Sequence, residues 1–137
     1  MLTTFTLSTS GPGLYEFTGD VARWLAGEGD GLLTLMVRHT SASLLIQENA
    51  DPDVQRDLKA YFSRAVPHAD DPAMSYLRHR SEGPDDMPAH IKAALLPVSL
   101  SIPVAGGRMT LGTWQGIYLF EHRDAPHTRQ VAAHFAA

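Results

Sequence analysis

The segment from Pro67 to Pro88 constrains the fold of this chain more than any other part of the sequence. It contains four prolines, one glycine and a cluster of aspartates, so neither a helix nor a strand can run through it. A connection of about twenty residues is long for a small domain, and such connections are more often functional or disordered than merely linking. We expect an ordered loop between a mixed first half and a strand-rich last third of the 137-residue chain.

The sequence before this loop predicts strands that alternate with two helices. Strands are expected over residues 2–7, 31–37 and 43–47. The segment 31–37 is apolar on both alternating faces, which is typical of a strand that is covered on both sides. A short helix is expected with Thr18 as its cap, and a longer helix begins at Pro52, where Asp51 is placed to cap it.

The sequence after the loop predicts one helix and three or four strands. A helix is expected over residues 89–96 and strands over residues 98–102, 108–111 and 115–122, while residues 128–135 fit either a strand or a short helix. Gly106 and Gly107 predict a tight hairpin between the first two of these strands. The whole pattern predicts one compact α+β domain over residues 1–137, with a mostly antiparallel sheet, about three helices and no internal duplication.

Composition excludes several classes of function. Eleven basic and fifteen acidic residues give a net charge of -4 and a pI near 5.9, so neither nucleic acid nor an anionic membrane is an expected partner. The chain has no cysteine, so no disulfide is expected and any metal ion would be held by nitrogen and oxygen. The first residues lack the basic head of a signal peptide, and prolines interrupt the longest uncharged stretch, Ala93 to Gly107. We therefore expect a cytoplasmic protein.

Four of the seven histidines are candidate metal ligands. His39 and His122 each end a predicted buried strand. His79 lies in the long loop, and His90 opens the helix that follows it. A histidine taken singly is more often structural, and no local spacing such as H-E-x-x-H is present. The combination with nearby carboxylates favours a site for zinc, iron or manganese. The remaining three are expected at the surface: His68, His127 and His134.

Acidic and amide side chains near these histidines each allow two interpretations. Asp85 and Asp86 precede the predicted helix, so they either cap it or act at the metal site together with Glu82. Glu48 and Asn49 end a predicted strand and are not needed as caps. They are therefore candidates for contact with a metal ion, a water molecule or a substrate.

Small hydroxyl residues and one tryptophan are candidate substrate-binding residues. Thr40, Ser41 and Ser43 could donate to a phosphate group, although such residues are equally ordinary in a turn. Trp114, beside Gln115, could stack on a heteroaromatic ring, but packing in the core or in an interface is the more common use of such a residue.

Four motifs between residues 30 and 124 carry a family resemblance. They are HTSAS (39–43), ENADPD (48–53), EGPDDMPAHIK (82–92) and LGTWQGIYLFEHR (111–123). In this order they resemble the YjbQ family, also called the secondary thiamine-phosphate synthase family. The four candidate histidines each match a histidine of the family. Tyr76 departs from the pattern, because it stands three residues before His79 where the family more often has Tyr-x-His, and Pro97 replaces a usual glycine.

The resemblance implies a compact α+β fold that assembles as a homotrimer, with the motif residues gathered in a pocket near a subunit interface. It also implies a thiamine-phosphate synthase activity, which joins a hydroxymethylpyrimidine diphosphate to a thiazole phosphate with loss of pyrophosphate. In that reaction a divalent ion held by some of the four histidines, with Lys92 and Arg123 nearby, would neutralise the leaving group, and diphosphate chemistry would make magnesium the expected ion. Glu82, Asp85 or Asp86 would orient ligands or move a proton.

Two other functions stay open. Magnesium, the usual partner of diphosphates, prefers oxygen ligands, whereas a histidine cluster prefers zinc, iron or similar ions. This mismatch favours a metal-dependent hydrolase or lyase that acts on a small phosphorylated metabolite, with thiamine-phosphate formation as a side activity. The third possibility is a trimer that binds a metal ion or a small anion without turnover.

Overall fold

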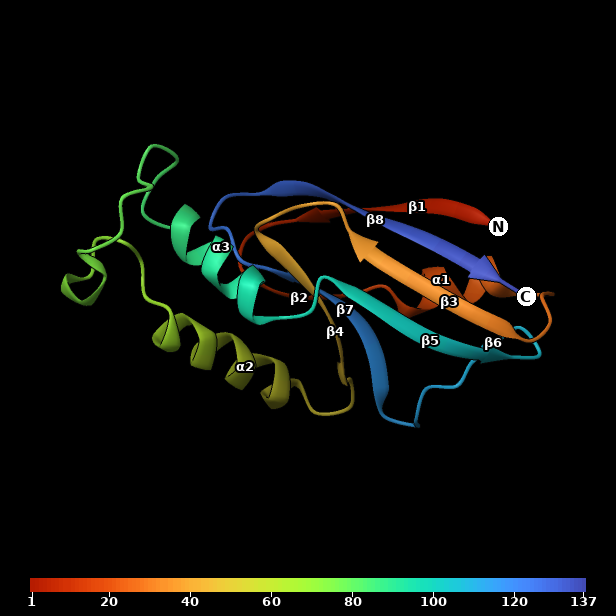
Figure 1. Ribbon diagram of the computed structural model, residues 1–137. Helices are drawn as coiled ribbons and strands as arrows, with labels where there is room; N and C mark the ends of the chain where they lie inside the picture. Colours follow the sequence, from red (N-terminus) through yellow and green to blue (C-terminus); the bar gives the residue numbers. More distant parts are fainter.

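The computed structural model describes residues 1–137 as two antiparallel sheets and three α-helices (Figure 1). The strands are β1 (Leu2–Thr9), β2 (Gly13–Glu16), β3 (Gly31–Val37), β4 (Ala42–Glu48), β5 (Ser99–Ala105), β6 (Arg108–Met109), β7 (Gln115–Glu121) and β8 (His127–Ala136). The helices are α1 (Thr18–Leu25), α2 (Pro52–Ala65) and α3 (Asp86–Leu95), and one 3-10 turn, η1, spans Pro72–Met74. The predicted α+β fold is confirmed. No helix is long and apolar enough to cross a lipid bilayer.

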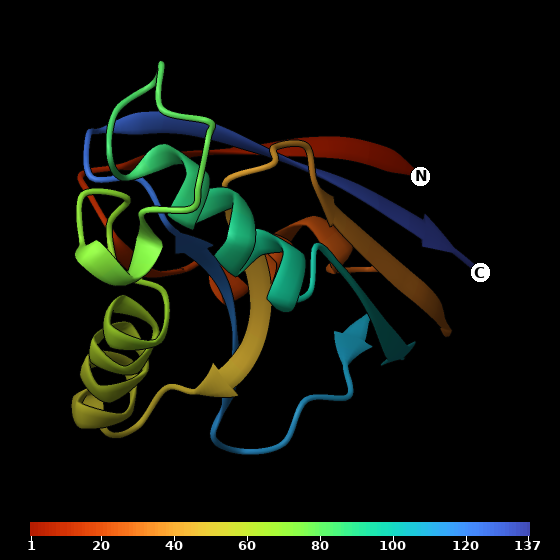
Figure 2. The same ribbon diagram turned by 60° about the vertical axis from the view of Figure 1, so that its left-hand side comes forward.

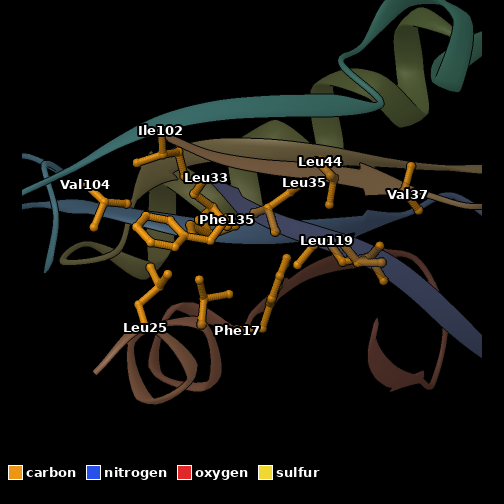
Figure 3. Close-up of a cluster of buried hydrophobic side chains, with 14 of the residues drawn as sticks. Phe17, Leu25, Leu33, Leu35, Val37, Leu44, Ile102, Val104, Leu119 and Phe135 are labelled. Carbon is orange, nitrogen blue, oxygen red and sulfur yellow. The ribbon is translucent and has the colours of Figure 1, made fainter. Parts of the chain in front are cut away.

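A five-stranded and a three-stranded sheet pack around one apolar core. Their strand orders are β1-β8-β3-β5-β6 and β2-β7-β4, and every pairing is antiparallel. Leu33 and Leu35 of β3 share the core with Leu44 of β4 and Leu119 of β7 (Figure 3). Helix α1 contributes Leu25 to the same cluster. Alternate residues of the strands thus point into the space between the sheets, as two packed sheets require.

Strand β7 is buried on both faces because α2 and α3 cover the outer side of its sheet (Figure 2). Ile117 and Leu119 belong to the core between the sheets. Tyr118 and Phe120 point the other way, and the ring of Phe120 lies 5.8 Å from the ring of Phe62 on α2. Helix α3 packs against β4. The buried strand predicted for residues 115–122 is confirmed.

Strand β3 differs from its prediction. Leu33, Leu35 and Val37 are buried, but Leu32 and Met36 on the opposite face are 46% and 49% exposed. Within this chain the expectation of a strand covered on both sides is therefore wrong. The second sheet covers only the inner side of β3, and the apolar outer side of the five-stranded sheet stays open.

Local differences from the predicted elements have simple causes. Strand β2 was not predicted; it begins at Gly13, directly after Gly11 and Pro12, and its four residues pair with β7. Thr18 is the first residue of α1 rather than its cap. Its hydroxyl donates to Glu16 and accepts the N–H of Ile117, so it links β2 to β7. Residues 127–136 form strand β8, so of the strand and the short helix predicted as alternatives for residues 128–135 the strand is confirmed.

The long loop is ordered by its own hydrogen bonds, as predicted. The guanidinium group of Arg80 donates to the carbonyl oxygens of Leu77 and Ala69. Asp71 caps η1 by accepting the N–H of Ala73 at 2.9 Å. The loop ends earlier than predicted, because α3 begins at residue 86 rather than residue 89. Proline is compatible with the first turn of a helix, so Pro88 does not delay the start.

A candidate metal-binding site at the start of helix α3

Asp86, in the first turn of α3, lies between two histidines. Its Oδ2 is 2.7 Å from Nε2 of His79 in the long loop and 3.2 Å from Nε2 of His90, one helical turn further along. One ligand atom from each of the three residues lies within 4.8 Å of the others. Asp86 is buried, His90 is half-buried and His79 is exposed, so the cluster opens to solvent on the side of His79.

The hydrogen bonds of His90 place a lone pair toward Asp86. Nδ1 of His90 lies 2.9 Å from the carbonyl oxygen of Thr40, which can only accept a hydrogen bond, so Nδ1 carries a proton. In the neutral ring, Nε2 then presents a lone pair to a carboxylate that is also an acceptor. A second proton or a metal ion is needed between His90 and Asp86. Metal-binding histidines commonly donate their other N–H to a backbone carbonyl in this way.

Arg123 holds both carboxylates at the start of α3. Its Nε donates to Oδ2 of Asp85 at 2.8 Å, and its Nη1 lies 2.9 Å from Oδ1 of Asp86. Its Nη2 donates to the carbonyl oxygen of Glu82. The side chain of Asp85 therefore binds Arg123 and does not cap the helix. Three of the five N–H groups of Arg123 are engaged in this way, so Arg123 positions the two carboxylates.

The same contacts set the pKa values of the two carboxylates. Burial raises the pKa of Asp86, but the hydrogen bond from His79 and the charge of Arg123 outweigh burial and hold this pKa below its ordinary value. Burial also raises the pKa of Asp85, and the hydrogen bond from Arg123 again lowers it below the ordinary value. Both side chains are therefore ionised at neutral pH.

An apolar cleft of about 360 Å³ opens beside His90, between α3 and the ends of β3 and β5. Its apolar lining consists of Met36, Val37, Ala93, Ala94 and Val98. Its polar lining consists of His39, Thr40 and His90. A cleft of this volume, with apolar walls and a few polar groups, is typical of a small-molecule site.

The other two predicted metal ligands, His122 and His39, are used elsewhere. His122 is buried, its Nε2 is hydrogen-bonded to the hydroxyl of Ser43 at 2.9 Å, and its Nδ1 has no partner. Burial, followed by the charge of Lys92, lowers the pKa of His122 to about 3, so the ring is neutral at physiological pH. His39 accepts the N–H of Gln130 at Nε2, and burial is the main cause that lowers its pKa. The structure thus brings together two of the four predicted histidines.

A buried ion pair that the sequence analysis missed lies beneath the site. The carboxylate of Glu121, at the end of β7, accepts hydrogen bonds from Nε of Arg129 at 2.8 Å and from the hydroxyl of Thr9 at 2.7 Å. It also accepts the backbone N–H groups of residues 122 and 123. Arg129 donates in addition to the hydroxyl of Ser41. Burial raises the pKa of Glu121, but the hydrogen bonds from Arg129 and Thr9 hold it below its ordinary value.

The opposite end of the three-stranded sheet carries four predicted substrate-binding residues, namely Glu48, Asn49, Trp114 and Gln115. Five positions along β4 separate Glu48 from Ser43, which is roughly 17 Å in an extended strand. The four residues therefore do not reach the histidine cluster of their own chain. Trp114 is 61% exposed, so it does not pack in the core of its own chain, and of the two predicted uses packing in an interface stays a prediction.

The remaining predicted residues take different positions. Lys92 is half-buried on α3 and makes no hydrogen bond or ion pair. Burial lowers its pKa, whereas the charges of nearby aspartates oppose this. Thr40 and Glu82 act through their backbone carbonyls, and the side chain of Ser41 serves Arg129. Tyr76 is 72% exposed in the long loop, away from the core.

The fold and the cluster define an α+β protein with a His-Asp-His group beside an apolar cleft. The family model "UPF0047 protein YjbQ-like" matches residues 3–137, and the chain belongs to this family. It is 49% identical over 130 residues to the UPF0047 protein sll1880 of Synechocystis, covering 93% of this chain and 86% of that protein. It is 45% identical over 133 residues to the UPF0047 protein YjbQ of Salmonella typhimurium, covering 95% and 93%. The family resemblance seen in the motifs is confirmed.

Solved structures have the same fold. An uncharacterized conserved protein of the YjbQ/UPF0047 family from Clostridium acetobutylicum matches with a TM-score of 0.84 and 34% identity, covering 98% of this chain and 99% of that chain. The hypothetical protein APE1520 from Aeropyrum pernix matches with a TM-score of 0.87 and 28% identity, covering 100% and 98%. These names state no reaction, so the function has to be argued from the site.

Proposed function

We propose that this protein is a metal-dependent enzyme that acts on a small phosphorylated metabolite, with thiamine-phosphate formation as the first reaction to test. The observation that carries the proposal is the arrangement of His90, whose Nδ1 donates to a carbonyl while Nε2 faces Asp86 and lies near His79. Two imidazoles and one carboxylate form a ligand set for zinc, iron or manganese. Such a set leaves coordination positions for water or substrate.

The distances in the cluster support a tetrahedral ion. Ligand atoms that each lie about 2.1 Å from zinc are separated from one another by roughly 3.4 Å in a tetrahedral site. The carboxylate oxygen of Asp86 lies 2.7 and 3.2 Å from the two imidazole nitrogens. Because His79 is exposed in a loop, it can move by the roughly 0.7 Å that widens its 2.7 Å contact with Asp86 to this separation. Arg123 holds the other oxygen of Asp86 and so directs Oδ2 toward the ion.

The cleft beside His90 offers a place for the organic part of the substrate. Its apolar walls suit a heteroaromatic ring such as a pyrimidine, and its volume of about 360 Å³ accepts a small metabolite. His39 accepts a backbone N–H at Nε2, which leaves the proton of its neutral ring on Nδ1 as a hydrogen-bond donor in the cleft wall. A divalent cation held by His79, Asp86 and His90 would supply positive charge for a leaving pyrophosphate or activate a water molecule.

We further propose that the protein assembles as a homotrimer with the cleft near a subunit interface. The outer face of the five-stranded sheet exposes Leu2, Leu32 and Met36, and Met36 also lines the cleft. Thr34 and His134 lie between these residues on the same face, and an exposed face that mixes large apolar and polar side chains in this way is suited to a protein contact. In such an assembly Trp114, which lies far from its own cluster, is free to contact a neighbouring subunit. Light scattering distinguishes a trimer from a monomer of 14.9 kDa.

The enzyme proposal is tested with purified protein loaded with zinc, manganese or iron(II). Hydroxymethylpyrimidine diphosphate and thiazole phosphate are supplied, and thiamine phosphate is quantified by chromatography. We expect turnover that a chelator abolishes and that falls at least about 100-fold in His90→Ala. The variant His127→Ala, which changes a histidine at the start of β8 outside the cleft and off the outer face of the sheet, should retain it.

Two results would overturn parts of the proposal. Turnover that is insensitive to both the chelator and His90→Ala would reject the metal ion. No turnover with these precursors, or with a panel of other phosphorylated metabolites, would reject the enzyme and favour binding without turnover.

A further inference from the structure

A second group of polar side chains lies on the side of α3 that faces away from the cleft. Residues 90, 93 and 94 line the cleft, whereas Lys92 is about 200° around the helix axis from His90. On that side a cavity of about 60 Å³ lies between α2, α3 and the end of β7. Its polar lining consists of Lys59, Ser63, His68, Lys92, Glu121, His122 and Asp124.

The donors in this cavity have no partner within the chain. Nδ1 of His122 is the one buried side-chain nitrogen or oxygen that lacks a hydrogen bond, although the residue is only 2% exposed. The ammonium groups of Lys59 and Lys92 form no ion pair. A buried polar group without a partner calls for an explanation, such as a water molecule or an ion.

The acidic groups of the wall are already engaged. Oδ2 of Asp124 lies 2.8 Å from Nε2 of His68. Glu121, which also lines the cavity, is paired with Arg129 and accepts the hydroxyl of Thr9. The carboxylate of Asp124 also acts on Lys92, so with His68 neutral the two ammonium groups leave the cavity an excess of one positive charge over Asp124, and this excess favours an anion.

The hydrogen bond between Ser43 and His122 completes the set of donors. When the hydroxyl of Ser43 donates to Nε2, the neutral ring of His122 carries its proton on Nδ1. The cavity then offers this N–H, two ammonium groups and the hydroxyl of Ser63. Several donors of this kind are suited to an oxyanion, whose oxygens accept charge-assisted hydrogen bonds.

We propose that this cavity binds one small oxyanion with the size and chemistry of inorganic phosphate, or of a single phosphoryl group. Its volume of about 60 Å³ exceeds the space that one water molecule needs, but it is well below the roughly 150 Å³ of a cavity that accepts benzene. An aromatic ring is therefore excluded. The site is separate from the His79–Asp86–His90 cluster and does not depend on the proposed reaction.

The test is a titration of the full chain with inorganic phosphate, in the presence of a chelator and at constant ionic strength. Calorimetry measures the affinity, and long-range proton–nitrogen NMR follows the ring nitrogens of His122. We expect saturable binding that shifts Nδ1 and that is at least about tenfold weaker in Lys92→Met. Lys59→Met is the second variant, since Lys59 is exposed and its replacement leaves the packing intact. Arg64→Gln, on an exposed part of α2 outside the cavity, is the matched control and should bind phosphate as the parent does.

Two further experiments distinguish the possible sources of the anion and test whether the cavity is independent of the His79–Asp86–His90 cluster. Methyl phosphate that competes with inorganic phosphate indicates that the cavity accepts the phosphoryl group of a metabolite, whereas binding of inorganic phosphate alone indicates the free ion. Both support the proposal. His90→Ala should leave phosphate binding unchanged, so a failure of the enzyme proposal does not affect this result. Absence of a saturable change in the chemical shift of Nδ1, or equal phosphate affinity in the parent and both lysine variants, would overturn the proposal. Water would then be the expected occupant of the cavity.

Discussion

Replacement of Arg129 by methionine tests whether the ion pair beneath the site stabilises the fold. Arg129 is 4% exposed and its partner Glu121 is fully buried. Removing one member of a buried ion pair typically costs about 3–5 kcal/mol, because the remaining charge has no partner. Here the carboxylate of Glu121 keeps hydrogen bonds from Thr9 and from two backbone N–H groups, which offset part of the loss. We therefore expect Arg129→Met to lower the free energy of unfolding by about 3 kcal/mol, the lower end of that range.

The assay is equilibrium unfolding in urea, with the free energy taken by linear extrapolation. Arg108→Met is the matched control, because Arg108 is an exposed arginine in a strand and forms no ion pair, and it should change the free energy by less than about 0.5 kcal/mol. The double variant Glu121→Met with Arg129→Met should lose less than Arg129→Met alone, because it leaves no buried charge. A loss below about 1 kcal/mol for Arg129→Met, at an unchanged m-value, would refute the reasoning.

Three further predictions concern stability and are read from the same urea transitions. The pKa of Glu121 in the folded protein is below its ordinary value of about 4.3. The ionised carboxylate therefore stabilises the fold fully above about pH 4.3, and this stabilisation is lost as the pH falls through the lower pKa of the folded state. A transition midpoint that stays constant down to about pH 3 would contradict this prediction. Leu35→Ala should lower the free energy of unfolding by about 2–5 kcal/mol, because Leu35 is fully buried between the sheets. Leu95→Ala, on the exposed side of α3, should lower it by less than about 1 kcal/mol. Equal losses in the two variants would refute the placement of the core. Gly107→Ala should lower the free energy of unfolding by at least about 1 kcal/mol, because Gly107 has a φ of +75° and an added Cβ would lie 2.7 Å from a backbone oxygen. Gly29→Ala should have little effect, because an added Cβ there meets open space.

The alternation of apolar residues was sufficient to predict most of the fold, and it failed where burial depends on a neighbouring layer. Asp51 caps α2 as expected, because a cap is a local feature that the sequence states directly. The apolar outer face of β3 has no cover within the chain, and no pattern within one strand shows which of its sides a second sheet will reach. Strand β2 has only four residues, too few for a period, and it forms because β7 is there to pair with it.

The sequence predicted which residue types make up the candidate site better than it predicted which of those residues lie together. The predicted start of α3 at residue 89 separated Asp86 from His90, although their spacing of four residues places them on one face once the helix begins at residue 86. His122 directly follows β7 and His39 lies two residues beyond β3, close to the predicted strand ends. The hydroxyl of Ser43 and the N–H of Gln130 each occupy one ring nitrogen of these histidines, and only the paired strands bring those groups there. Arg129 occupies the same alternate positions of β8 as its buried apolar residues, which is the signal that could have revealed it.

The claim on which the functional account depends is that Asp86, His79 and His90 bind one divalent transition-metal ion. Cobalt(II) is a suitable probe because its visible spectrum reports the ligands, and titration of the metal-free protein gives the stoichiometry. We expect one equivalent per chain, and an affinity that falls by more than about 100-fold in Asp86→Asn and in His90→Ala. His39→Ala, which removes a histidine outside the cluster, should bind as the parent does. Cobalt binding that is absent in the parent, or that is unchanged in both cluster variants, would contradict the account.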